Sequence, residues 1–327
     1  MTDVPFKTNL TDPDWNLILN RIQDQKCTPI LGSAVYQTAL DFRLSLAQRW
    51  LDRYHKAWQA AVGDQADAAP PSEDSLELAR VAQYLTVQEG DMQALKDEFL
   101  KLLPKEVPAP NFDDPDEPYH ILAELPIPIY LTTNYDDFMS QALRKNRLRD
   151  PKTVICRWND DVAKTLDLMT DSKFDFNKTF QPSVPNPMVF HCHGHTEVPE
   201  SLVLTEDDHL SFLVTVSRDL DNIHDMASRD RAVLPAPIQQ ALIGGSLLFI
   251  GFRLTDWSFR VVFQGMLRSL LAPSRRSKRG LAVQLPIQDR YTQRYLQTYY
   301  DRMNMRVFWG TATEFMIELR NRWRALT

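Results

Sequence analysis

The chain has 327 residues, of which 43% are hydrophobic and 24% charged, so it has globular composition and length for one large domain or two average ones. Its net charge of −6 gives no electrostatic reason to expect nucleic acid as a partner. Its three cysteines are an odd number and lie far apart, which favours a reducing cytosol and excludes a four-cysteine zinc site.

The first third of the chain reads mainly as helix. A helix is expected to begin at Asp12–Pro13, because an acid and a proline favour the first helical turn. The short apolar run CTPIL at 27–31 predicts a strand that leads into a turn at Gly32. An amphipathic helix is expected over 37–60 and a second helical stretch over about 75–103. Loops rich in proline and acidic residues are expected at 61–74 and 104–118.

From residue 119 onward, short apolar runs alternate with helical or loop segments. Such runs fit strands that are buried on both faces of a parallel sheet. The expected strands are 125–131, 153–156, 188–192, 202–204, 247–251 and 281–285. Strands that alternate with helices predict the α/β class, with a parallel sheet sandwiched by helices.

Ligand sites in such sheets lie beyond the carboxyl ends of the strands. The chain has only ten glycines, yet Gly32, Gly194 and Gly251 each close a predicted strand. This coincidence is the strongest physical sign of one shared ligand crevice.

The ends of the first and fifth runs carry small residues. Gly32, Ser33 and Ala34 lead from a strand into a helix, where backbone N–H groups bind phosphate, or they form a plain tight turn. Gly251 is followed five residues later by Asp256, which caps a helix near Trp257 or lies near a ribose hydroxyl.

The run ending in TTNYDD is unusually polar for the end of a buried strand. Asp136 or Asp137 can cap the following helix. Capping does not explain Thr132, Thr133 and Asn134, and asparagine has poor strand propensity, so this stretch indicates a site.

The stretch HCHGH contains His191, His193 and His195. If the strand continues, the three histidines share one face, because side chains alternate with period two. A metal site, a single titrating histidine beside Gly194, and a polar rim without function all remain open. We favour the titrating histidine and expect no bound metal.

No apolar run approaches the about 18 residues of a membrane helix, and the N-terminus lacks the apolar core of a signal peptide. We therefore expect a cytoplasmic protein without membrane contact. A basic cluster is interpreted as a solvated loop rather than a nucleic-acid site, and it consists of Arg275, Arg276, Lys278 and Arg279.

Taken together, the motifs resemble the SIR2-like domains of bacterial anti-phage immune effectors. The resemblance rests on TTNYD at 132–136, HCHGH at 191–195, SLVLTEDDHLSFL at 201–213, LLFIGFRLTDWSFR at 247–260 and the closing segment 299–323. At the first strand end, sirtuins have Gly-Ala-Gly-x-Ser, whereas this sequence has a single glycine in that motif.

The resemblance implies a Rossmann-like core with a smaller helical lobe and no zinc ribbon, in a single domain over 1–327. The core is expected at about 10–37 and 119–327, and a helical insertion at about 38–118. The implied activity is hydrolysis of NAD⁺ at the nicotinamide–ribose bond, without a metal. The family's essential residues fall on Asn134 and His193. NAD⁺ contacts are expected at Gly32, Ser33, Ala34, Thr133, Asp136, Gly194, Gly251 and Asp256.

An unregulated hydrolase of NAD⁺ would poison its own cell, so we expect gating by homo-oligomerisation or by a sensor. The sensor would be supplied by a neighbouring gene or by a longer chain from which this domain comes. The alternatives are a non-catalytic NAD⁺ or ADP-ribose binding or assembly module, an NAD-dependent deacylase, and a metal-dependent hydrolase built on His191 and His193.

Overall fold

A computed structural model describes residues 10–62, 77–146, 148–169, 174, 179–221, 233–254, 256, 259–261, 263, 280–284 and 289–326. The basic cluster at 275–279 and Trp257 lie outside these residues. None of the helices in this part of the chain has both the length and the apolar character needed to cross a bilayer.

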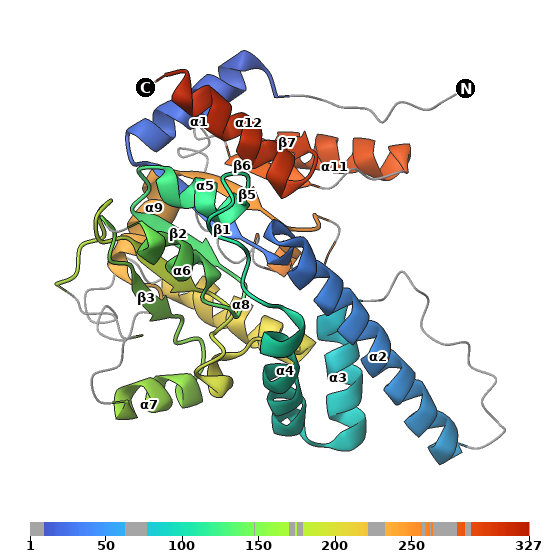
Figure 1. Cartoon of the computed structure of the whole chain (residues 1–327). Helices are drawn as coiled ribbons and strands as arrows, with labels where there is room; N and C mark the ends of the chain where they lie inside the picture. The colour runs from blue at the N-terminus through green and yellow to red at the C-terminus, as the bar shows by residue number, and fades with distance from the viewer. Residues whose placement is uncertain are drawn as a thin grey trace.

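The fold is a seven-stranded parallel sheet in the order β3-β4-β2-β1-β5-β6-β7 (Figure 1). The strands are β1 (Cys27–Leu31), β2 (Ile129–Thr132), β3 (Lys152–Ile155), β4 (Met188–His191), β5 (Ser246–Ile250), β6 (Gly280–Gln284) and β7 (Met305–Trp309). Successive strands lie on both sides of β1, so the sheet has a topological switch point at its centre, where α/β folds bind ligands.

Helices surround this sheet on both faces. They are α1 (Asp12–Gln23), α2 (Gln37–Val62), α3 (Leu78–Glu89), α4 (Met92–Glu106), α5 (Pro118–Glu124), α6 (Phe138–Lys145), α7 (Asp160–Leu168), α8 (Glu206–Asp221), α9 (Ala236–Gly244), α11 (Arg290–Arg302) and α12 (Ala312–Arg324), with short 3₁₀ turns η1 (Ser33–Val35) and η4 (Pro199–Ser201).

Each central strand supplies side chains to two separate cores. Leu31 and Ile250 pack with α1 to α6 and α12, whereas their neighbours Ile30 and Phe249 pack with α7, α8, α9 and α11. This alternation follows from the period of two along a strand, and it explains why every residue of β1 and β5 is buried. The predicted α/β sandwich is confirmed.

The helices α2, α3 and α4 extend together away from the sheet (Figure 1, lower right). The helical stretch expected over about 75–103 is two helices, because Gly90 ends α3 in a left-handed conformation (φ 72°) and Asp91 caps α4 through the N–H of Ala94. The domain boundaries expected at 37–38 and 118–119 stay a prediction.

Two predicted strands differ from the structure. The strand expected over 125–131 begins only at Ile129, since Pro126 and Pro128 lack the N–H that a ladder needs. Residues 202–204 form no strand. Val203 donates one backbone hydrogen bond to the His193 carbonyl, and the chain then enters α8.

Candidate active site

A cavity of about 630 Å³, including the space at its open mouth, lies beyond the carboxyl ends of the central strands. Ser33, Thr133, His193 and Gly251 reach it from the segments after β1, β2, β4 and β5. Residues of three helices and of the segment after β5 complete the lining: Leu40, Arg43 and Leu44 of α2, Glu77 and Leu78 at the start of α3, His209 of α8, and Phe252, Arg253, Asp256 and Phe259 after β5.

His193 is the residue of this cavity best suited to acid–base chemistry. Its ring lies edge-on to His209 and to Phe212, with centroid distances of 4.9 and 5.1 Å. Burial, and then the neighbouring charges of His209 and Arg43, lower the pKa of His193 well below its ordinary value, so the ring is neutral at pH 7. Its Nε2 is buried and makes no hydrogen bond within the described residues. A neutral imidazole of this kind can exchange a proton with a ligand.

Asn134 lies directly behind the cavity wall rather than on it. Its neighbour Thr133 lines the cavity, whereas the Asn134 side chain is 5% exposed and is not among the lining residues. Its Nδ2 donates to the Gly32 carbonyl (3.2 Å) and to the Tyr119 hydroxyl (3.1 Å). In this position the amide joins the ends of β1 and β2 to α5.

The three strand-closing glycines are explained mainly by close packing of the backbone. A Cβ on Gly32 would lie 2.5 Å from the Gly251 carbonyl oxygen, and one on Gly251 (φ 79°) would lie 2.2 Å from the Val35 nitrogen. A Cβ on Gly194 (φ 93°) would lie 2.2 Å from the Ser201 carbonyl oxygen. Of the three, Gly251 alone is among the residues that line the cavity in the described part of the chain.

The turn after β1 already uses backbone donors that a phosphate would need. Ala34 donates its N–H to the Gly251 carbonyl (2.9 Å), and Val35 donates to the Gly32 carbonyl (3.2 Å). Ser33 lines the cavity. The Ala34 N–H is therefore already bonded within the turn, and phosphate binding at Gly32, Ser33 and Ala34 stays a prediction.

Asp136 acts in the turn before α6. Its Oδ1 accepts the N–H of Phe138 (3.1 Å), and Asp136 is not among the cavity-lining residues. Burial raises the pKa of Asp136 to about 7, partly offset by the hydrogen bond from Phe138. The N-cap position of α6 is Asp137, so the Asp136 contact closes the turn before the helix and is not a helix cap, and the role of Asp136 toward a ligand stays a prediction.

Charged residues of both signs line the cavity, and the sequence analysis missed most of them. Arg253 pairs with the predicted Asp256 at 3.4 Å, while Arg43 and Glu77 come from the helices. Arg43 and Glu77 sit in segments with no strand-end signal. His209 lies inside the TEDDH stretch that carried the resemblance, so the sequence did contain a signal for it.

The three histidines of HCHGH would share a face only if the strand continued through them, and this condition is not met. Strand β4 ends at His191, and the positive φ of Gly194 turns the chain back. His191 packs on His195 with a ring-centroid distance of 4.8 Å, while His193 packs on His209. His191 and His193 are therefore not arranged as ligands of one metal.

A different group, Asp137, His191 and His195, has potential ligand atoms within 4.8 Å of one another. The Nδ1–H of His191 donates to the Asn134 carbonyl (3.2 Å), which leaves its Nε2 with a lone pair. His195 is in the opposite state, because its Nδ1 accepts the Glu197 N–H (3.1 Å) and its proton is then on Nε2. Since a metal needs a lone pair on that Nε2, this tautomer does not suit metal binding, and the expected absence of a metal stays a prediction.

Comparisons with known proteins place these motifs in a family. A family model described as "SIR2-like domain" matches residues 128–308, more than half of the chain. Three curated relatives carry the name NAD(+) hydrolase ThsA. The protein of Enterococcus faecium is 24% identical over 65% of this chain and 36% of its own length. The protein of Acinetobacter baumannii (strain 532279) is 26% identical over 44% of this chain and 23% of its own length, and that of Bacillus cereus (strain MSX-D12) is 28% identical over the same shares. The matched region thus spans about a third or less of these relatives.

Proposed function

Because this chain belongs to the family of SIR2-like domains, we propose that it is an NAD⁺ hydrolase that cleaves the nicotinamide–ribose bond. The products are nicotinamide and ADP-ribose. The observation that carries the proposal is His193, a neutral imidazole with a buried, unpartnered Nε2 on a cavity at the carboxyl ends of the strands, in the described part of the chain. The name NAD(+) hydrolase of three relatives supports the same reaction.

The cavity provides groups that match parts of NAD⁺. Arg43 and Arg253 are cations that suit the pyrophosphate, and Asp256 is a carboxylate that suits ribose hydroxyls. Leu40, Leu44 and Phe252 offer apolar surface for a ring. Ser33, Thr133 and Gly251 line the same cavity and are proposed as contacts of NAD⁺. Gly32, Ala34, Asp136 and Gly194 are not among the lining residues of the described part of the chain.

The reaction adds water across the bond, so a proton must be removed while nicotinamide leaves as a neutral molecule. As positive charge develops on C1′ of the ribose, His193 accepts a proton from the attacking water or from a ribose hydroxyl. General-base assistance of this kind contributes about 10²–10⁴-fold to a rate. The released proton balances the reaction of NAD⁺ with water.

Asn134 is proposed as the second catalytic residue, orienting the attacking water or a ribose hydroxyl. For this role its carboxamide has to leave the Gly32 carbonyl and the Tyr119 hydroxyl and turn toward the cavity. Substrate that enters beside Thr133 would supply the competing hydrogen bonds.

We further propose that the activity is a gated effector function, in anti-phage defence by NAD⁺ depletion. Gating by homo-oligomerisation, or by a sensor on a partner or on a longer chain, follows from the cost of uncontrolled NAD⁺ loss to the cell. The relatives that match are about three to four times longer than the matched region, which leaves room for such a sensor in a protein of that kind.

The test is nicotinamide release from NAD⁺ over a series of protein concentrations. We expect release to rise more steeply than protein concentration, and His193→Ala to lower it by at least about 100-fold. His120→Ala is the matched control, because His120 lies in α5 and contacts the Phe112 carbonyl rather than the cavity. Equal release by wild type and His193→Ala would refute the proposal.

A non-catalytic NAD⁺ or ADP-ribose binding module is the second candidate. It is favoured by one observation, the Asn134 side chain held behind the cavity wall. If this candidate is right, wild type and Asn134→Ala bind ADP-ribose with the same dissociation constant. The protein then releases no nicotinamide from NAD⁺ at any concentration tested.

A further inference from the structure

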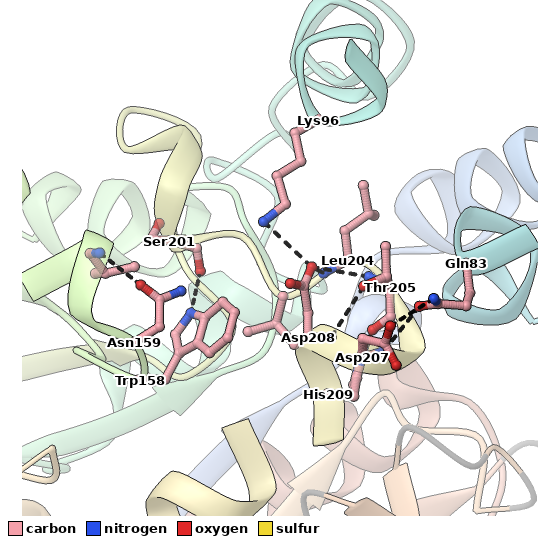
Figure 2. Close-up of polar contacts among 12 residues, drawn as sticks. Gln83, Lys96, Trp158, Asn159, Ser201, Leu204, Thr205, Asp207, Asp208 and His209 are labelled. Atoms are coloured by element: carbon pink, nitrogen blue, oxygen red, sulfur yellow. Dashed lines mark hydrogen bonds and ion pairs between the residues drawn. The ribbon is translucent and has the colours of Figure 1, made fainter. Parts of the chain in front are cut away.

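The first turn of α8 is held by the helices α3 and α4 through three consecutive acidic residues. Arg80 of α3 pairs with Glu206 at 3.0 Å. Gln83 of α3 exchanges two hydrogen bonds with Asp207, donating from Nε2 to Oδ2 (2.8 Å) and accepting the Asp207 N–H (3.1 Å). Lys96 of α4 pairs with Asp208 at 3.4 Å (Figure 2). We call these three contacts the α8 clamp.

The Lys96–Asp208 contact differs from the other two in its burial. The Lys96 and Asp208 side chains are 5% and 7% exposed, whereas those of Arg80 and Glu206 are 34% and 28% exposed. The Lys96 ammonium also lies 6.0 Å from the ring centroid of Trp158. Taking both charges out of water costs free energy, so a pair that serves only to join two helices gains little from being buried.

Asp208 is also the residue that fixes where α8 begins. Its Oδ2 accepts the N–H groups of Leu204 (3.0 Å) and Thr205 (3.2 Å). Its own N–H donates to Thr205 Oγ1 (3.1 Å). One carboxylate oxygen therefore receives Lys96 and two backbone donors, as Figure 2 shows. Any movement of Lys96 changes the charge environment of the turn that starts the helix.

The next residue carries this arrangement to the cavity. His209 is bound to the same turn, because both its N–H (3.1 Å) and its Nδ1 (2.8 Å) contact the Thr205 carbonyl. Its ring lies edge-on to His193, and the two residues line the cavity together. Val203, just before the turn, donates to the His193 carbonyl (2.9 Å). The side chain and the backbone of His193 are thus both in contact with the segment that Asp208 organises.

We propose that Lys96 and Asp208 are positioning residues for His193, and that α3 and α4 set the geometry of the cavity through the α8 clamp. The expected effect on kcat rests on the proposed function, whereas the expected effect on the position of His193 does not. Neither residue is among those lining the cavity, so they act through His209 and the 203–205 turn. A partner or second copy that moves α3 and α4 would change the position of His193 by this route.

The experiment compares Lys96→Met, Asp208→Asn and the double variant with a matched control, Arg49→Met. Arg49 of α2 pairs with Glu106 of α4 at 3.0 Å, so the control removes a cation between the same group of helices without touching α8. Nicotinamide release gives kcat and KM. Histidine labelled with ¹³C at the ring gives an NMR signal for each imidazole, independent of turnover.

We expect both single variants to lower kcat by about tenfold or more while KM stays within about twofold, since misplacement of a catalytic group by about 1 Å can cost that much. The His193 and His209 signals should shift in both and stay in place in Arg49→Met. The double variant should recover folding stability relative to the single variants, but not kcat.

A lone buried charge can unfold the protein, so Gln83→Leu serves as a second variant that breaks only the Asp207 contact. It should shift the His209 signal and lower kcat by a smaller factor. Unchanged His193 and His209 signals in Gln83→Leu and in the double variant would overturn the inference. Absence of nicotinamide release by wild type would instead overturn the proposed function, and the NMR comparison would still decide the inference.

Discussion

His191, His193 and His195 are close in sequence but lie in two different environments. His193 lines the cavity beside His209, whereas His191 and His195 pack together away from it. Gly194 separates them, because its φ of 93° reverses the chain immediately after His193. The chemistry available at His193 therefore depends on a backbone conformation that other residues rarely adopt.

We expect Gly194→Ala to destabilise the protein by about 2–4 kcal/mol, because the alanine is strained at positive φ and its Cβ meets the Ser201 carbonyl. Gly90→Ala is the control. Its φ is also positive (72°), but nothing lies within 4 Å of the added Cβ, so it should cost only about 1 kcal/mol. Urea unfolding measures both, and an equal loss in the two variants would contradict the close-packing explanation.

Asp136 provides a test that depends on pH. Burial raises its folded pKa from 3.8 to about 7, so its contribution to stability is complete below pH 3.8 and is lost as pH rises to about 7. Asp136→Asn keeps an acceptor for the Phe138 N–H and removes this loss. We expect the unfolding free energy of the variant to exceed that of wild type by about 2 kcal/mol at pH 8 and to equal it near pH 4. This value is smaller than the full pKa shift would give, because the carboxyl is only half-buried.

Urea unfolding from pH 4 to 8 gives this comparison directly. If the difference in unfolding free energy between the variant and wild type stays constant across this range, the pKa of Asp136 is not raised by folding. Nicotinamide release by the same variant tests the role of Asp136 toward a ligand, since a residue that only closes the turn leaves the rate unchanged.

Among the elements, the ends of β1 and β2 are joined by side-chain hydrogen bonds of Thr133 and Asn134. Asn134 connects the ends of β1 and β2 to α5, through the Gly32 carbonyl and the Tyr119 hydroxyl. The same residue is the proposed catalytic amide. Loss of activity on substitution would therefore have two sources, and stability must be measured along with rate.

We expect Asn134→Ala to lower the unfolding free energy by about 1–3 kcal/mol, because it removes the donor to the buried Tyr119 hydroxyl and one of the two donors to the Gly32 carbonyl. Tyr119→Phe removes only the hydroxyl partner and should cost about 1 kcal/mol or less. Thermal and urea unfolding of the two variants provide the comparison. An Asn134→Ala protein as stable as wild type but inactive would assign the amide to catalysis rather than to the fold.

The sequence predicted most elements because their signals are local. Apolar runs buried on both faces identify β1, β4 and β5, and the Asp12–Pro13 start identifies α1. The run at 202–204 was misread as a strand, because an apolar run is buried in the same way in a turn that packs under a helix. Periodicity cannot separate these two cases over three residues.

At the scale of the whole molecule, the charged lining of the cavity could not be predicted. Arg43 comes from α2 and Glu77 from the start of α3, and both reach a cavity formed at strand ends far along the chain. The α8 clamp is of the same kind, since Arg80 and Glu206 are 126 residues apart. Contacts of this range depend on how elements pack, and a single sequence carries no local pattern for them.

The central claim is that NAD⁺ binds in this cavity with its nicotinamide-side ribose against His193. A crystal structure with a non-hydrolysable NAD⁺ analogue tests it most directly. We predict the pyrophosphate near Arg43 and Arg253, and a ribose hydroxyl or water about 2.6–3.2 Å from His193 Nε2. An analogue bound elsewhere, or bound in the cavity with no polar atom within reach of His193, would contradict the account.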